Sequence, residues 1–410
     1  MTQEAILPFN PRSAEFRANP YPTYHYLRTH HPIYFHQGRW LLTRYADVFE
    51  VLKNPNFGHS ESGLINSDTV VTNQSPINQL LSMRQESQQL ISLWLLLRNP
   101  PEHTRLRKVL GNHFNQKRMQ TLQLNIQAKV NEFIKHVEEQ GKMDTVNDLA
   151  YPLMSDLICE MWLGIPKQEQ HPNLKKWSDN VSLLTDLEAT SIANEQGLLA
   201  IAGLASYFRN WIDKCRTNSK LQNNLVGAFI QAEGQISQEE ILAHCIIMYF
   251  AACSTTKHSI SNTILTLLNH PEQLQKLQAD PTLIKMTISE VLRYDSPVQG
   301  MSRTALSDIQ LSNQTIRQGE IITCLIGAAN RDPAQFPEPD KFDIQRQPNP
   351  HLSFGRGIHI CVGRHLAQLV AEIAVGTLVC RFPKLSLATD TLEWDESFLA
   401  HGLKSLPVTF

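Results

Sequence analysis

The chain has 410 residues, of which 42% are hydrophobic and 19% charged, and its formal net charge at pH 7 is −2. This apolar fraction can build a sizeable core, which excludes a globally disordered chain. The near-neutral charge excludes a strongly basic nucleic-acid binder, and we expect no nucleic-acid partner.

Export and membrane signals are not apparent in the sequence. No run of about 18 apolar residues is present, as a membrane-spanning helix would require, and Met1–Arg12 lacks a charged segment followed by an apolar one. The seven cysteines show no spacing typical of a zinc site. We therefore expect a cytoplasmic protein with reduced thiols, and a monomer.

The N-terminal part combines strand and helix patterns. Two short apolar runs, Ile33–Phe35 and Trp40–Thr43, predict a β-hairpin, and Tyr45–Leu52 predicts a short helix after it. Between residues 58 and 98 the periodicity is weak and polar residues are frequent. We predict a long loop there, and a loop of that length in a compact chain is usually functional.

Beyond Pro100-Pro101 the sequence becomes mostly helical. The longest periodic segment is Ser237–Asn269, which begins with the capping-box pattern Ser237-Gln238-Glu239-Glu240. Five prolines between residues 333 and 350 predict a rigid irregular stretch. We predict one domain, residues 1–410, mainly α-helical with small β-sheets. The other expected helices are Arg105–Phe114, Met119–Gln140, Leu174–Thr185, Leu198–Cys215, Pro281–Tyr294 and Val362–Cys380.

A glycine-rich turn containing a cysteine, Phe354-Gly355-Arg356-Gly357-Ile358-His359-Ile360-Cys361-Val362-Gly363, precedes the last long helix. Backbone N–H groups at a helix start favour a thiolate, and glycines let a flat group approach closely. This arrangement suits a macrocycle whose iron is bound by a thiolate. A dinucleotide-binding turn fits less well, because Ile360 stands where the third glycine would be. A hydrolase pair of Cys361 and His359 would lack a third, orienting group.

The pattern Phe354-x-x-Gly357-x-x-x-Cys361-x-Gly363 resembles the haem-binding signature of the cytochrome P-450 superfamily, in its bacterial branch. The resemblance extends over nearly the whole chain. It implies the P-450 fold, with the long central helix over the haem, and haem b as cofactor. Cys361 would then be the thiolate ligand of the iron, Phe354 would pack against the sulfur, and His359 would hydrogen-bond a haem propionate.

The resemblance also implies partners for the two propionates of a haem. Buried carboxylates need Arg or His partners, because an unpaired buried charge is costly. His103 and Arg107, four residues apart, and Arg303 lie in stretches similar to the propionate-binding segments of the family.

A second motif of the family is Glu-x-x-Arg, which Glu290-x-x-Arg293 resembles. Its partner in the family is an arginine of the proline-rich stretch, and Arg346 matches that position. We expect these three residues to form a structural cluster.

The central helix departs from the family pattern. Where members usually carry Ala/Gly-Gly-x-Asp/Glu-Thr-Thr, this chain has Ala251-Ala252-Cys253-Ser254-Thr255-Thr256. Thr255 is expected to hold the oxygen network, with Ala251 beside it. Ser254 replaces the carboxylate that would relay protons, and a serine supplies no proton at a carboxylic pKa. Three readings stay open: proton delivery through waters or the substrate, chemistry that depends less on the relay, or slower and leakier turnover.

The resemblance implies an apolar substrate pocket and an external electron donor. A basic patch near the haem would attract an acidic ferredoxin or flavodoxin. The expected function is a monooxygenase that hydroxylates or epoxidises an apolar small molecule with O2 and two electrons. The alternatives are oxidative coupling, dehydrogenation or peroxide-driven oxidation, and, in another class, a haem-binding sensor without turnover. The expected pocket residues are Ile247, Met248, Val298, Gln299, Met301, Phe398 and Leu399. The expected patch residues are Arg105, Lys108, Lys117, Arg118, Arg356 and Arg364.

Overall fold

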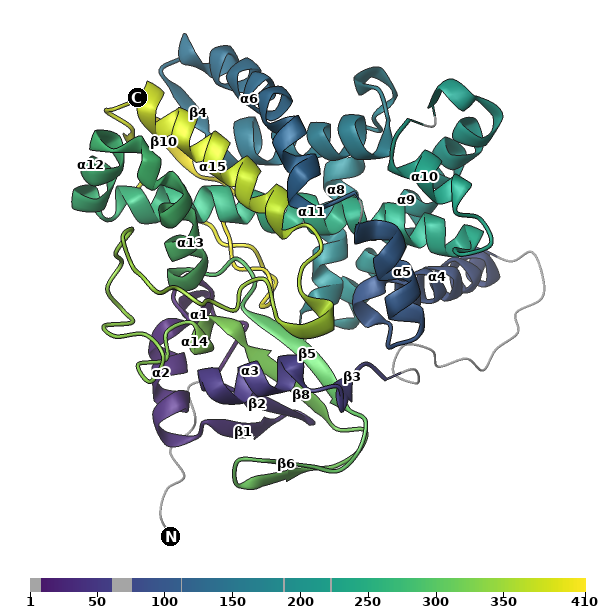
Figure 1. Ribbon diagram of the computed structural model, residues 1–410, viewed down its shortest axis with the longest axis horizontal. Helices are drawn as coiled ribbons and strands as arrows, with labels where there is room; N and C mark the ends of the chain where they lie inside the picture. The colour runs from purple at the N-terminus through teal and green to yellow at the C-terminus, as the bar shows by residue number, and fades with distance from the viewer. Residues whose placement is uncertain (1–8, 61–75, 112, 187–188, 222) are drawn as a thin grey trace.

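The computed structural model describes residues 9–60, 76–111, 113–186, 189–221 and 223–410. In Figure 1 a sheet-rich part lies at the bottom of the view and a larger helical part above it. The helices are α1 Ala14–Ala18, α2 Tyr21–His30, α3 Tyr45–Lys53, α4 Pro76–Ser92, α5 Glu102–Gly111, α6 Gln116–Glu138, α7 Tyr151–Asp156, α8 Leu174–Ser182, α9 Ser191–Thr217, α10 Leu225–Gln231, α11 Gln238–Leu268, α12 Pro271–Ala279, α13 Ile284–Tyr294, α14 Ile326–Ala329 and α15 Arg364–Arg381. The strands are β1 Ile33–His36, β2 Arg39–Leu42, β3 Phe57–Gly58, β4 Lys142–Asp144, β5 Gly300–Ala305, β6 Ile309–Leu311, β7 Gln314–Ile316, β8 Ile321–Leu325, β9 Ser386–Leu387 and β10 Pro407–Thr409.

The principal sheet has the strand order β1-β2-β8-β5-β3. Its first two strands form the predicted hairpin, with Ile33 opposite Leu42. The two-residue turn Gln37-Gly38 has φ angles of 45° and 79°, the left-handed region that a tight hairpin turn requires. Strand β8 pairs in parallel with β2 and antiparallel with β5, and β5 pairs antiparallel with β3. The sheet therefore brings residues 300–305 beside residues 57–58, far apart in the sequence.

Helix α11 passes through the centre of the helical part (Figure 1). The predicted capping box is present at its start: the Glu240 N–H donates to Ser237 Oγ at 3.1 Å, and the Ser237 N–H donates to Glu240 Oε2 at 2.8 Å. Nearly all of its length is buried, including polar side chains such as Lys257 and Asn262. It contacts α7, α8, α9, α13 and α15. α11 is thus a fixed wall for whatever binds next to it.

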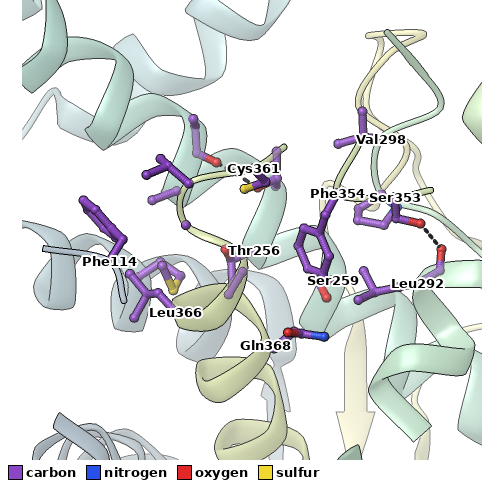
Figure 2. Close-up of a pocket in the computed structure, with 18 of the residues that line it drawn as sticks. Phe114, Thr256, Ser259, Leu292, Val298, Ser353, Phe354, Cys361, Leu366 and Gln368 are labelled. Atoms are coloured by element: carbon purple, nitrogen blue, oxygen red, sulfur yellow. Dashed lines mark hydrogen bonds between the residues drawn. The ribbon is translucent and has the colours of Figure 1, made fainter. Parts of the chain in front are cut away.

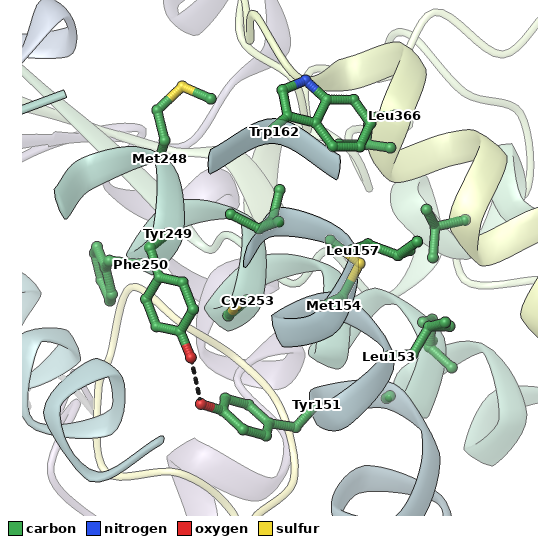
Figure 3. Close-up of a cluster of buried hydrophobic side chains, with 14 of the residues drawn as sticks. Tyr151, Leu153, Met154, Leu157, Trp162, Met248, Tyr249, Phe250, Cys253 and Leu366 are labelled. Atoms are coloured by element: carbon green, nitrogen blue, oxygen red, sulfur yellow. Dashed lines mark hydrogen bonds between the residues drawn. The ribbon is translucent and has the colours of Figure 1, made fainter. Parts of the chain in front are cut away.

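The face of α11 toward α7 includes a buried polar pair. The hydroxyls of Tyr151 and Tyr249 lie 2.7 Å apart, and Ser155 Oγ lies 3.0 Å from Tyr249 Oη. Figure 3 shows the two tyrosines pointing toward one another among apolar side chains that include Leu153 and Leu157. Because buried hydroxyls must be hydrogen-bonded, this pair fixes how α7 packs on α11.

Several expectations from the sequence were wrong or incomplete. The long loop expected for residues 58–98 contains α4, while residues 61–75 lie outside the described part. α4 was missed because its surface is polar apart from a narrow stripe; Ser87 on that stripe donates to the Leu198 carbonyl at 2.9 Å, and Leu90 is buried. Helix α12, the helical run from residue 145 to 163 and strands β5 to β8 were also missed.

Among the described residues, no helix is long and apolar enough to cross a membrane.

Candidate functional site

Cys361 lies on the loop between the 3₁₀ turn η8 (Gly357–His359) and α15. Its N–H donates to the Phe354 carbonyl at 2.9 Å, which closes the loop. Gly357 has a φ of 70°, and a Cβ added there would lie 2.4 Å from the Leu52 carbonyl oxygen. Only glycine permits both the backbone conformation and this close approach to the end of α3. The position of the thiol is therefore set by the loop, as the signature suggested.

The surroundings of the Cys361 thiol contain groups that favour and disfavour a charge. Burial raises the pKa of Cys361, whereas the N–H groups of Gly363 and Arg364 and the Arg107 guanidinium lower it. These N–H groups are at the first residues of α15, where the helix dipole favours an anion. A metal cation bound to the sulfur would reverse the effect of burial, because a coordinating thiol is deprotonated. The site therefore suits a thiolate with a cationic partner.

A cavity of about 220 Å³ separates the Cys361 loop and α15 from α11. Figure 2 shows Cys361 and Phe354 on the loop, with Thr256 and Ser259 from α11 nearby. The Thr255 hydroxyl, which also lines the cavity, donates to the Ala251 carbonyl at 2.8 Å. No Asp or Glu occurs among the described residues that line the cavity. The lining residues are Phe114, Met154, Ile158, Met248, Ala251, Ala252, Thr255, Thr256, Ser259, Leu292, Pro297, Val298, Met301, Ser353, Phe354, Cys361, Val362, Gly363, Leu366, Ala367 and Gln368.

A group of basic side chains from α5, β5 and η8 lies together: His103, Arg107, Arg303 and His359, which we call the Arg/His cluster. The rings of His103 and His359 lie edge to face, with centroids 4.4 Å apart. His103 and Arg303 are buried, and both ring nitrogens of His359 are buried without a hydrogen-bond partner among the described residues. No Asp or Glu of the described residues pairs with either guanidinium. Buried donors without acceptors are costly, so this cluster requires an anion.

The Glu290 carboxylate is fully buried and holds two arginines. Arg293 donates to it from Nε and Nη2, both at 2.8 Å, and Arg346 donates from Nε at 3.0 Å. Arg293 also donates to the Pro339 carbonyl at 2.7 Å. The three residues that the family resemblance groups therefore lie together, and they link α13 to the irregular stretch that precedes the Cys361 loop.

Comparisons with known proteins agree with this geometry. The sequence model of the family described as Cytochrome P450 matches residues 81–400. The chain belongs to the cytochrome P450 family. It is 35% identical to the "Biotin biosynthesis cytochrome P450" of Bacillus subtilis (strain 168) over 404 residues, 97% of this chain and 98% of that one. It is 34% identical to the "Vitamin D(3) 25-hydroxylase" of Pseudonocardia autotrophica over 406 residues, 97% of this chain and 95% of that one.

Solved P450 structures share the fold along the whole chain. The structure of P450BioI in complex with hexadec-9Z-enoic acid ligated acyl carrier protein superposes with a TM-score of 0.87 at 35% identity. The match covers 97% of this chain and 99% of that one. The expected fold class, mainly α-helical with small sheets, is confirmed. The protein is a P450 monooxygenase of small molecules, with haem b as its cofactor, O2 as co-substrate and an external redox partner.

The residues present fit a haem. The macrocycle would occupy the apolar cavity, with Cys361 on one side and α11 on the other. A Cβ on Gly363 would meet no atom within 4 Å, so the backbone there borders open space, as a flat group requires. The unpaired donors of the Arg/His cluster provide partners for two carboxylates. A P450 haem thus accounts for the cavity, the thiol and the cluster together.

The predicted pocket residues are only partly brought to the cavity. Met248, Val298 and Met301 line it, but Ile247, Gln299, Phe398 and Leu399 do not. Gln299 is buried and donates from Nε2 to the Ser296 carbonyl at 2.8 Å. Phe398 packs with Phe9 and Phe16, and the Leu399 carbonyl accepts the Gln299 N–H, so these residues belong to the sheet-side core. On α11, Ala251 and Thr255 line the cavity, whereas Ser254 is buried away from it.

Some site residues were not singled out from the sequence. Four apolar residues line the cavity from positions where an apolar side chain is usually an ordinary core residue: Phe114 between α5 and α6, Met154 on α7, Ile158 in the helical turn Leu157–Leu163, and Leu366 on α15. These residues follow the apolar spacing of ordinary helices, and this spacing does not distinguish a cavity residue from a core residue. His59 was missed as well, because it stands alone in a weakly patterned segment and reaches the Arg/His cluster only through the pairing of β3 with β5.

Proposed function

We propose that residues 1–410 act as one haem-thiolate domain that hydroxylates or epoxidises an apolar small molecule, with Cys361 as the ligand of the haem iron. Haem, when bound, supplies the activation of O2 with two electrons and two protons, so that one oxygen atom enters the product and the other leaves as water. The observation that carries the proposal is the placement of Cys361 on an apolar cavity with unpaired basic donors at its edge. The seven cysteines are thiols and not disulfides, which supports a reducing, cytoplasmic location.

The residues around Cys361 have separate tasks in this proposal. The N–H groups of Gly363 and Arg364 and the charge of Arg107 stabilise the thiolate. Phe354 covers the sulfur side of the cavity, while His103, Arg107, Arg303 and His359 bind the propionates. As a ligand of the haem iron, the Cys361 thiolate would supply the electron donation that favours O–O cleavage.

On the α11 side, Ser254 stands where the family usually has an acid, so another source of protons is needed. We propose that protons reach Thr255 Oγ1 through water, because no Asp or Glu of the described residues lines the cavity. The Thr255 hydroxyl donates to the Ala251 carbonyl, which leaves its oxygen lone pairs free to accept a hydrogen bond from a water in the cavity and so to hold that water in place. Ser254, buried away from the cavity, takes no direct part.

Replacing Thr255 by alanine is expected to lower the product formed per NADPH consumed by at least about tenfold, since proton transfer by a positioned group commonly contributes more than that. Product and NADPH are measured together in steady turnover with a surrogate ferredoxin system. The matched control is Thr263→Ala, because Thr263 makes the same bond to a carbonyl four residues back, at 2.6 Å, but does not line the cavity. An equal loss of product per NADPH in both variants would show that the Thr255 hydroxyl only stabilises the helix and has no part in proton delivery.

An apolar substrate is supported by the residues available to contact it. Met248, Val298 and Met301 present flexible or branched apolar groups to the cavity, and Thr255 is among its few polar ones. We therefore propose an extended apolar molecule, of the class represented by the hexadec-9Z-enoic acid and the vitamin D(3) in the names of the similar proteins.

The test of the proposed function is an optical titration of the purified ferric protein. The ligands are fatty acids, a hexadecenoyl acyl carrier protein, terpenoids, vitamin D3, macrolides, indoles and aromatic peptides. A saturable low-spin to high-spin shift with an apolar ligand supports the proposal and gives the class for turnover assays. A shift only with polar or charged ligands would overturn the apolar assignment.

The electron donor is proposed to be an acidic ferredoxin or flavodoxin. Lys108, Lys117 and Arg118 are exposed on α5 and α6, shortly after Arg107 in the sequence, and favour an acidic partner. Two residues of the predicted patch differ from expectation: Arg105 pairs with Glu240 at 2.5 Å, and Arg356 is half-buried. We expect electron transfer from a surrogate ferredoxin to slow as salt is raised; a rate independent of salt would contradict a charged docking surface.

A further inference from the structure

His59 is placed beside the Arg/His cluster by the pairing of β3 with β5. Phe57 pairs with Ala305 and Gly58 with Thr304, and the next step of this antiparallel register sets His59 opposite Arg303. The Asn99 side chain fixes the backbone of His59 from both sides: Asn99 Oδ1 accepts the His59 N–H at 2.9 Å, and Asn99 Nδ2 donates to the His59 carbonyl at 2.7 Å. The imidazole therefore has a defined position.

The ring of His59 faces the cluster. It lies edge to face with His359, with centroids 5.1 Å apart and an interplanar angle of 83°. Its Nε2 is buried and has no hydrogen-bond partner among the described residues. Burial, Arg303 and His103 lower the pKa of His59 to about 3, so the ring is neutral and carries one N–H to donate.

A buried donor without an acceptor costs free energy, so an acceptor is expected at this position. The Arg/His cluster already requires an anion, and a haem brings two carboxylates. Each carboxylate offers about four lone-pair sites, which leaves room for a donor beyond the four of the cluster. No carboxylate of the described residues takes this place.

We propose that His59 is a fifth donor to the haem propionates, next to Arg303. This inference rests on the proposed function, because it requires a haem in the cavity. His59 is a positioning residue: it hydrogen-bonds the edge of the cofactor and takes no part in the reaction. With Asn99, it ties the segment that follows β3 to the bound cofactor.

Two variants distinguish the effect of the His59 N–H donor from the effect of its aromatic ring. His59→Phe keeps a ring edge-on to His359 but has no donor, while His59→Gln keeps an N–H donor but has no ring. The measurements are the propionate bending bands in the resonance Raman spectrum of the holoprotein and the rate of haem transfer to apomyoglobin. His25→Phe is the control, because His25 is an exposed histidine on α2.

We expect His59→Phe to shift a propionate band and to speed haem transfer by roughly tenfold, as for the loss of one hydrogen bond to a charged group. His59→Gln and His25→Phe should leave the band close to that of the wild-type protein. An unshifted band in His59→Phe, or a change in His59→Gln alone, would show that the ring only packs, and would overturn the inference. A wild-type protein without a haem absorption band would instead contradict the proposed function itself.

Discussion

Replacing Cys361 by histidine is expected to abolish hydroxylation while the protein still binds haem. An imidazole is a competent haem ligand, but it is neutral and lacks the electron donation of a thiolate that favours O–O cleavage. The cavity, the Arg/His cluster and α11 are unaffected by the change, since Cys361 lies on a loop whose course is set by its glycines. We expect product formation to fall by at least about a thousandfold, which corresponds to about 4 kcal/mol of transition-state stabilisation.

The measurement combines the absorption spectrum of the ferrous carbon monoxide complex with the rate of product formation. The spectrum should change from that of a thiolate-bound haem to that of an imidazole-bound haem. Cys380→Ser is the control, because Cys380 is an exposed free thiol at the end of α15. Full hydroxylation by Cys361→His, or an unchanged spectrum, would show that another residue binds the iron.

The second large effect is expected at Glu290, the buried carboxylate that holds Arg293 and Arg346. Both arginines stay charged when Glu290→Gln removes the negative charge, and Arg293 is fully buried. Removing one partner of a buried ion pair costs about 3–5 kcal/mol. This is a large part of the roughly 5–15 kcal/mol that stabilises a typical folded protein, so the variant should unfold at much lower urea and should be isolated with little haem.

The effect should reach the haem site because the cluster links α13 to the stretch before the Cys361 loop. Arg346 also donates to the Pro337 carbonyl at 2.7 Å, and Asn349 Nδ2 donates to Glu290 Oε2 at 3.2 Å. Glu338→Gln is the matched control, because its pair with Lys341 lies on the surface, at 3.6 Å, and is expected to contribute less than about 1 kcal/mol. Similar urea midpoints for both variants would contradict the structural role of Glu290.

The sequence predicted best those features that local chemistry determines. The capping box at Ser237 and the glycine turn before Cys361 use side chains and backbone angles that few alternatives satisfy. The grouping of Glu290, Arg293 and Arg346 and that of His103, Arg107, Arg303 and His359 were expected from the family resemblance. Spacing along the chain alone would not have joined α5, β5 and η8 into one cluster.

Features that depend on tertiary packing were not predictable in the same way. Helix α4 is polar over most of its surface and is stabilised by its contact with α9, which includes the hydrogen bond of Ser87. Phe398 and Leu399 were assigned to the pocket, but they pack in the sheet-side core with Phe9 and Phe16. The surroundings of His59 depend on the pairing of β3 with β5. The paired residues 58 and 304 are more than 240 positions apart in the sequence. No local pattern carries that information.

The most direct test of the central claim is the fate of the oxygen atoms of O2. The purified protein, a surrogate ferredoxin system and the ligand with the strongest spin shift are incubated under ¹⁸O2 in unlabelled water. We expect a product with one ¹⁸O atom, since a monooxygenase inserts one oxygen of O2 into its substrate. A product that forms with electron consumption but contains no ¹⁸O would contradict it, and would show that the protein, without an acid at position 254, performs coupling or dehydrogenation instead.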